Sequence, residues 1–151
     1  MKKKAEEVVA SLKKREEAVK KTVPNTAPPS VFVFAGGKNS VMTTGNKSIE
    51  SYIIKTAGGH NIFEDIDGVL FGKTSWEAVI DRNPEVIIIH TGTVISDAKT
   101  TVEFLKSKKE LSEVPAIKNN RFFAIPFPKV ASGLENLDYL EDLARFLHPE
   151  K

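Results

Sequence analysis

Apolar and polar residues follow two different periods along this chain. Three short apolar runs predict strands, at 30–35, 85–89 and 121–126. The run from Val86 to Ile89 has no polar interruption, which is typical of a strand buried on both faces, as in a parallel sheet. Apolar residues spaced three or four apart predict helices over about 48–56, 75–81 and 134–147, together with a helix that Asp97 caps and that contains Val102, Phe104 and Leu105.

The start of the chain predicts one long helix. Residues 5–21 carry apolar side chains at helical spacing, namely Ala5, Val8, Val9, Leu12 and Val19. This stripe is narrow, so we expect the helix to lie against the rest of the protein without being enclosed by it. Three prolines follow and predict a short extended connector, Pro24, Pro28 and Pro29.

Strands that alternate with helices predict an α/β fold. We expect a three-layer, mostly parallel sheet flanked by helices, a Rossmann-like lobe, with the N-terminal helix as a long connector. The helix over 48–56 is expected to end at Gly58-Gly59 and to bury one face, formed by Ile49, Tyr52, Ile53 and Ala57. Between the regular elements we expect a glycine-rich loop over 36–45, an irregular stretch over 60–73 with a short strand at 69–71, and turns over 111–120.

Composition narrows the class of protein and of partner. The 151 residues carry a net charge of +2, which predicts no nucleic-acid partner. Lysines and glutamates interleave in the first helix, as on a solvated face. The chain has no cysteine, which excludes disulfides, thiolate metal sites and cysteine nucleophiles. No apolar run reaches the ~18 residues needed to span a bilayer.

The glycine-rich segment Gly36-Gly37-Lys38 does not match a nucleotide-binding loop. Phe32 stands where that motif requires its first glycine, and Asn39 stands where it requires Ser or Thr. Two interpretations remain open. The glycines either leave room for a ligand beside the strand end or form a structural turn.

The histidines and serines do not form a metal or catalytic set. No histidine has a partner four residues away, and no serine lies in a Gly-x-Ser-x-Gly turn. His148, at the end of the last helix, is expected to be structural. His90 ends the second predicted strand, and ligands of open α/β sheets bind beyond the carboxyl ends of the strands. It is therefore either a ligand contact or axial metal donor, or a residue that hydrogen-bonds its own loop.

Several local patterns occur together in a characteristic order. They are Val31–Phe34, Met42–Asn46, Ala57–Phe63, Ser75–Glu77, Asn83–Ile89, Val114–Arg121 and Leu147–Pro149. In this order the chain resembles the C-terminal lobe of the substrate-binding proteins that serve ABC importers of iron–siderophore complexes, haem and cobalamin. The resemblance runs from the first helix to the end.

The resemblance implies two domains in this chain. Residues 1–23 would be the helix that connects two lobes, and 24–151 the C-terminal α/β lobe. We expect the N-terminal lobe, a natural partner of this one, and the export signal to be absent from this chain. The mature protein would be periplasmic, or extracellular and membrane-anchored.

Two roles are expected for Glu77. Thr74 and Glu77 fit a capping box, with Thr74 at the N-cap and Glu77 three residues into the helix. In the family that the chain resembles, a surface glutamate on each lobe docks into arginine pockets of the permease, and Ser75-Trp76-Glu77 matches the C-lobe position. The two roles are compatible.

The resemblance places the ligand contacts on the loops beyond the strand ends. The expected ligand-binding residues are Gly36, Lys38, Met42, Thr43, Thr44, His90, Thr91, Gly92, Phe127 and Lys129. Lys38 and Lys129 would attract an anionic chelate and Phe127 would stack on a ring; the alternative for each residue is a solvated loop position.

The function that follows is solute binding without catalysis or resident cofactor. The cargo would be an Fe(III) chelate, haem or cobalamin, delivered to ABC permease subunits through the Glu77 surface. The alternative is a stand-alone doubly wound α/β enzyme or regulatory domain with its site at the same strand ends. A homodimer of this lobe, which would cover the narrow stripe of the first helix, is a further hypothesis.

Overall fold

A four-stranded parallel sheet forms the centre of the protein. The computed structural model describes residues 10, 13–21, 27–36, 41–67, 71–91, 98–126 and 136–148. The sheet has the order β3-β1-β5-β6, and its strands are β1 (Ser30–Phe34), β3 (His60–Asn61), β5 (Val86–Thr91) and β6 (Phe122–Pro126). The predicted mostly parallel α/β fold is confirmed.

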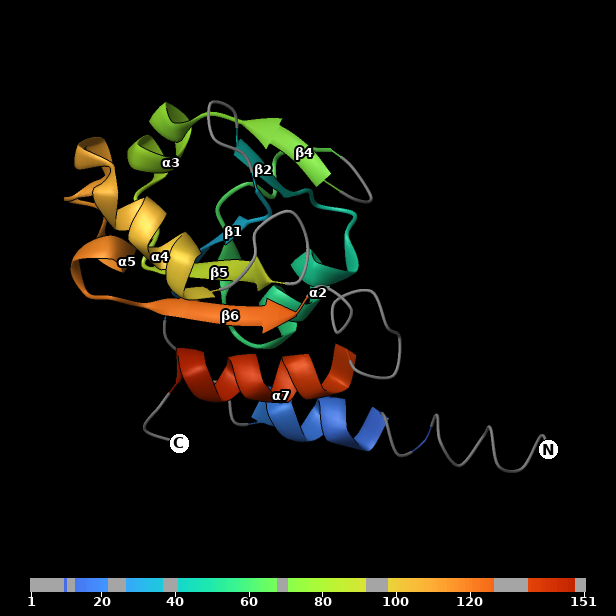
Figure 1. The fold of residues 1–151 in the computed structure, drawn as a ribbon. Coiled ribbons are helices and arrows are strands. Elements are labelled where there is room, and N and C mark those ends of the chain that lie inside the picture. Colours follow the sequence, from blue (N-terminus) through green and yellow to red (C-terminus); the bar gives the residue numbers. More distant parts are fainter. Residues whose placement is uncertain are drawn as a thin grey trace.

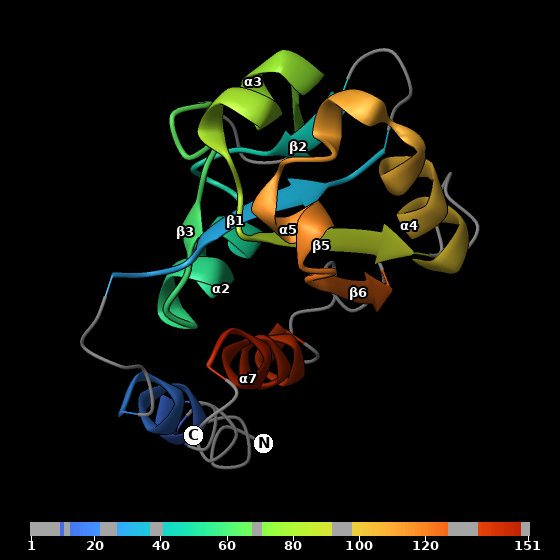
Figure 2. The same ribbon diagram turned by 90° about the vertical axis from the view of Figure 1, so that its left-hand side faces the viewer.

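Helices cover both faces of this sheet (Figures 1 and 2). One face carries α2 (Ile49–Thr56) and α7 (Asn136–Leu147). The other carries α3 (Trp76–Arg82), α4 (Ala98–Ser107), the 3-10 turn η1 (Lys109–Leu111) and α5 (Pro115–Lys118). These are the three layers that the sequence predicts.

The central strands β1 and β5 are buried on both faces. Side chains alternate along a strand, so successive residues face opposite layers. Val33 and Ile88 belong to the core under α2 and α7, whereas Phe34 and Ile89 belong to the core under α3 and α4. All four side chains have an exposed fraction of 0%. The uninterrupted apolar run of β5 is therefore explained by two cores that share one strand.

A second, two-stranded sheet was not predicted. β2 (Val41–Thr44) pairs antiparallel with β4 (Phe71–Thr74), where the sequence suggested a loop and a strand at 69–71. β2 is fixed to the end of β1 because Ala35 N donates to Met42 O at 2.8 Å and Met42 N donates to Gly36 O at 2.9 Å. Such pairing between distant segments leaves little trace in local sequence. The two-residue strand β3 was missed for the same reason.

Helix α2 begins and ends as predicted. Ser48 Oγ accepts from Ser51 N at 3.0 Å and caps the first turn. At the other end Gly58 has a φ of +87°, and Gly59 N donates to Ile54 O at 2.8 Å, which is a Schellman motif. A Cβ on Gly59 would lie 3.1 Å from side chains of Ile54, Val31 and Leu147, so this glycine lets α2, β1 and α7 approach closely.

The N-terminal helical segment (residues 13–21) lies beside α7, outside the layers (Figure 2). Val19 is its buried apolar contact, with an exposed fraction of 6%. Arg15 donates to Asp138 at 2.8 Å and to Glu141 at 2.5 Å, both on α7. The described part of the predicted 5–21 helix is thus attached mainly by polar contacts. Among the described residues, no helix has the length and apolar character needed to cross a membrane.

Candidate functional site

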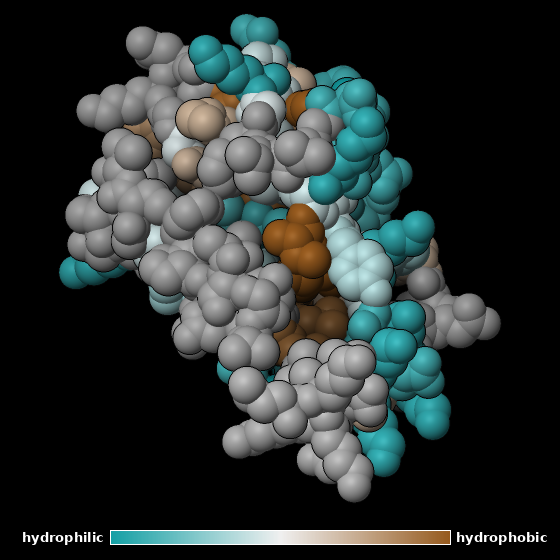
Figure 3. All heavy atoms as spheres, turned by 90° about the vertical axis from the view of Figure 1, so that its right-hand side faces the viewer, coloured by the Kyte–Doolittle hydropathy of each residue, from teal (hydrophilic) through white to brown (hydrophobic). Residues whose placement is uncertain are grey.

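The strand ends that the sequence marked as a site lie at one edge of the sheet. Phe34 is level with Ile89, and Thr91 is level with Pro126. β5 and β6 run in the same direction, toward the side of the molecule that Figure 3 shows (Figures 1 and 3). We call this side the carboxyl edge. The structure therefore brings Gly36, Met42 and Thr91 to the same edge.

The predicted ligand contacts differ in their exposure. Met42 and Thr91 are half-buried, whereas the remaining described members are buried, namely Gly36, Thr43, Thr44 and His90. Four further members lie outside the described residues, namely Lys38, Gly92, Phe127 and Lys129. Of the described set, Met42 and Thr91 have side-chain surface to offer a ligand.

His90 points into the protein, which corrects its prediction as a ligand contact. It follows Ile88 by two positions on β5, so its side chain faces the same layer, under α2 and α7. The ring has an exposed fraction of 1%. Its Nε2 lies 2.9 Å from both carboxylate oxygens of Glu50 on α2, so the hydrogen bonds run to a neighbouring helix.

Glu50 joins three elements. Besides His90, its Oε2 accepts a hydrogen bond of 2.5 Å from the hydroxyl of Tyr139 on α7. Glu50 and Tyr139 each have an exposed fraction of 1%. Burial, followed by the charge of Glu50 and the hydrogen bond to it, raises the pKa of Tyr139 well above its ordinary value. We call Glu50, His90 and Tyr139 the buried triad.

Sequence reasoning missed Glu50 because the face of α2 that it assigned to the core is only partly buried: Ile53 and Ala57 are buried as predicted. The predicted face included Ile49 and Tyr52, but these are 49% and 51% exposed. Beside Ile53, the buried face contains Glu50 and Ile54. A signal was present, since a glutamate three and four positions before two isoleucines lies on the same side of a helix as they do.

Thr43 and Thr44 form a buried polar spot on β2. Their exposed fractions are 0% and 2%. Neither Oγ1 has a hydrogen-bond partner among the described residues. Unpaired buried hydroxyls are uncommon in folded proteins. Both threonines were predicted as direct ligand contacts. Their burial contradicts that role.

Glu77 is exposed in the first turn of α3, but the predicted capping box is wrong. Ser75 is the N-cap, because its Oγ accepts from Ala78 N at 3.1 Å. Glu77 is then the second residue of the helix, one position too early to reach back to the cap. A carboxylate in the first turn still suits the helix dipole. Its exposure leaves the carboxylate available to a partner.

The carboxyl-edge side also presents apolar surface. Figure 3 shows apolar atoms near the middle of this side. Among the described residues, the large apolar side chains with substantial exposure are Ile49 and Tyr52 of α2. The Tyr52 hydroxyl donates to Glu16 of the N-terminal helical segment, and this contact raises the pKa of Tyr52.

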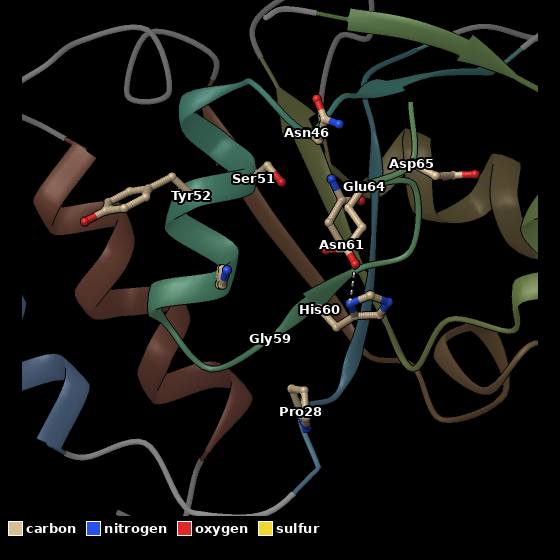
Figure 4. A pocket seen from close by; sticks show the side chains of 10 residues that line it. Pro28, Asn46, Ser51, Tyr52, Gly59, His60, Asn61, Glu64 and Asp65 are labelled. Atoms are coloured by element: carbon tan, nitrogen blue, oxygen red, sulfur yellow. Dashed lines mark ion pairs between the residues drawn. The ribbon is translucent and has the colours of Figure 1, made fainter. Parts of the chain in front are cut away.

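A groove of about 760 Å³ lies between α2 and the segment that follows β3 (Figure 4). Ser51 points toward it from α2, whereas the ring of Tyr52 points away. Three of its lining residues take part in polar contacts, since His60 lies 3.6 Å from Glu64 and Asp65 lies 2.6 Å from Arg82. Arg82 lowers the pKa of Asp65 through their hydrogen bond. Both contacts belong to the wall formed by β3 and the segment that follows it.

Comparison with known proteins gives a consistent answer. The family model for periplasmic binding proteins matches residues 1–128. A vitamin B12-binding protein of Salmonella typhi is 29% identical over 138 residues, which is 89% of this chain and 48% of that protein. The chain thus spans about half the length of this relative.

Solved structures agree with the fold. A periplasmic binding protein from Veillonella parvula superimposes with a TM-score of 0.85 and 26% identity, over 98% of this chain and 51% of that one. The periplasmic haem-binding protein of Vibrio cholerae gives a TM-score of 0.82 with 18% identity, over 98% and 58% of the two chains. The latter likeness concerns the fold.

Proposed function

The chain belongs to the periplasmic binding protein family, and from this premise we propose that it is the C-terminal lobe of the solute-binding component of an ABC importer. Members of the family are periplasmic and bind solutes for transport rather than catalyse reactions. Residues 24–151 would be the lobe, and 1–23 the helix that leads to a second lobe. The protein would work in the periplasm or tethered outside a membrane.

The observation that carries this proposal is that the parallel strands end at one edge, in a chain that matches the family model. The family match covers most of the lobe. Within it, β1, β5 and β6 all end at the carboxyl edge, where ligands of open α/β sheets bind. We assign the cargo to this edge, with Met42 and Thr91 as its described contacts and Gly36 as the glycine that leaves room beside them. We propose the same ligand for the four predicted contacts outside the described residues, Lys38, Gly92, Phe127 and Lys129.

The proposed cargo is a metal-centred chelate or macrocycle. Relatives that are named vitamin B12-binding proteins support cobalamin as the first candidate. A solved relative named for Fe3+-hydroxamate transport and one named for haem binding support the wider class. Half of the cleft would come from the other lobe.

Calorimetry on the intact protein tests the cargo. We expect cyanocobalamin, haem or ferrichrome to bind with a Kd below about 1 μM, equivalent to about −8 kcal/mol. A Met42→Ala variant should bind that probe more weakly. Exposed Lys118, on α5 at the opposite end of the sheet from the carboxyl edge, is the control site, and Lys118→Ala should bind unchanged. Absence of binding to all three probes would refute the proposed cargo.

Glu77 is proposed to dock the lobe onto the permease. An exposed carboxylate on a helix end can form charge-assisted hydrogen bonds with arginines. In reconstituted vesicles that contain the permease, Glu77→Ala should reduce transport while ligand affinity stays unchanged. Asp81→Ala, an exposed acid on the same helix, is the matched control and should transport normally. Equal transport by the two variants would refute the docking role.

A further inference from the structure

The buried triad lies beneath three segments that border the carboxyl edge. Glu50 is in the first turn of α2, shortly after β2 with its Met42. His90 comes directly before Thr91, the last residue of β5. Tyr139 is in the first turn of α7, and its ring stacks on Phe123 of β6, which ends at the carboxyl edge. One carboxylate thus connects the bases of three segments that are far apart in sequence.

The hydrogen bonds of the triad hold these segments in one particular geometry. A buried carboxylate is costly unless donors satisfy its oxygens, and both oxygens of Glu50 accept from His90 while one also accepts from Tyr139. Hydrogen bonds to a charged group are short and depend strongly on geometry. Apolar side chains around the triad, such as Ile53 and Leu140, pack without such preferences. The triad therefore fixes positions that apolar packing alone would leave adjustable.

The phenol ring extends the network to the edge strand. The Tyr139 ring stacks on Phe123 of β6, with centroids 6.0 Å apart and planes at 11°. β6 in turn pairs with β5 at the level of Thr91 and Pro126. Displacement of Tyr139 would therefore also reach the third strand whose end forms the edge.

We propose that Glu50 is a positioning residue, which acts through His90 and Tyr139 to hold the three segments of the carboxyl edge in the arrangement that binds ligand. The inference rests on the proposed function. Glu50 does not contact the ligand itself, because an exposed fraction of 1% leaves no surface for it. Loss of the Glu50 carboxylate changes ligand affinity by changing the positions of Met42 and Thr91.

Two variants of the intact protein test the inference. Glu50→Gln keeps the shape but removes the charge, and Tyr139→Phe removes one donor. We expect both to weaken binding of the probe that the wild type binds, among cyanocobalamin, haem and ferrichrome, by about tenfold or more. Titration at a temperature well below the melting temperature keeps every variant folded during the measurement.

A stability-matched control separates positioning from general support. Leu143→Ala removes a side chain with an exposed fraction of 0% from α7, the helix of Tyr139, and from the core that α2 and α7 cover. It should lower the melting temperature at least as much as Glu50→Gln, yet change affinity by less than twofold. Equal affinity in Glu50→Gln and wild type, or equal weakening in all three variants, would overturn the positioning role.

Failure of the proposed function gives a different result. If the wild type binds none of the three probes, the proposed cargo is refuted and the positioning role is decided by NMR. Glu50→Gln should then shift the amide resonances of Met42 and Thr91, whereas Leu143→Ala should not. Unshifted resonances in Glu50→Gln would overturn the inference by themselves.

Discussion

The two faces of the central sheet are built by different means. Under α3 and α4 the core is aromatic and apolar, with the ring of Phe34 5.5 Å from that of Trp76 and 6.4 Å from that of Phe104. Under α2 and α7 the core contains three polar side chains joined by hydrogen bonds, Glu50, His90 and Tyr139. Both faces exclude water equally, since Phe34 and His90 are 0% and 1% exposed.

The difference shows where stability and specificity reside in one lobe. Apolar packing tolerates exchange of side chains of similar volume, and it supplies most of the free energy of folding. A satisfied buried polar network adds little net stability but penalises every arrangement that breaks it. The polar face is also the one that reaches the bases of the candidate ligand segments. Four experiments test this contrast.

The largest effect is expected on the aromatic face. Phe34→Ala removes a ring that contacts Phe32, Trp76 and Phe104 and leaves a cavity, which should cost about 3–5 kcal/mol. Urea denaturation followed by circular dichroism measures this loss. Phe34→Leu, the control that stays apolar and fills more of the space than alanine, should lose less. A loss below about 1 kcal/mol in Phe34→Ala would contradict the contrast, because it would mean that the site collapses freely.

The next effect concerns the polar face. Glu50→Gln leaves the donors of His90 and Tyr139 poorly satisfied, which should cost about 1–3 kcal/mol. Replacing all three members by apolar residues, Glu50→Leu, His90→Leu and Tyr139→Phe, should recover much of that loss. The same urea titration decides it. A triple variant far less stable than Glu50→Gln would show that the triad contributes more than mutual satisfaction.

An alkaline pH profile separates the faces further. The folded-state pKa of Tyr139 is raised, so its contribution is complete below the ordinary tyrosine pKa of about 10 and is lost as pH rises above it. The wild type should therefore lose stability above pH ~10, and Tyr139→Phe should lose less over the same range. Tyr52→Phe, which removes a half-exposed phenol, is the control and should follow the wild type more closely. Thermal melts across this range provide the measurement.

The smallest effect is expected outside both faces. Arg15→Ala removes the contacts from the N-terminal helical segment to Asp138 and Glu141, whose side chains are 56% and 25% exposed. The melting temperature should change less than in any variant above, and the difference should shrink as salt screens the charges. A salt-independent loss as large as that of Phe34→Ala would mean that this segment is part of the core.

The fold could be predicted where periodicity and burial coincide. The run Val86–Ile89 indicated a doubly covered strand, and the leucines of the last helix indicated its buried side, which the structure confirms for Leu140 and Leu143. Strand β2 could not be predicted, because Val41–Thr44 becomes a strand through pairing with a segment 30 residues later, Thr44 with Phe71 at one end and Val41 with Thr74 at the other. Local sequence does not encode that pairing.

For the candidate site, the sequence predicted which strand ends share an edge but not the direction of each side chain. The sequence placed Gly36 and His90 at neighbouring strand ends, and the register of β1 and β5 confirms that they share an edge. It could not tell that His90 turns inward, because a polar residue that ends an apolar run is compatible with either direction. Its direction depends on an acceptor, Glu50, which lies 40 residues away in the sequence.

The order of strands in the sheet has a consequence for how the chain folds. Val31 of β1 pairs with Val86 of β5, and Ile87 pairs with Phe122 of β6, so each central ladder must wait for a long stretch of chain to be made. Sheets built from such distant partners fold slowly. A polypeptide emerging from the ribosome therefore keeps β1 without its main partner, β5, until at least the residues up to Thr91 have been synthesised, and during that interval the apolar strand is exposed to aggregation.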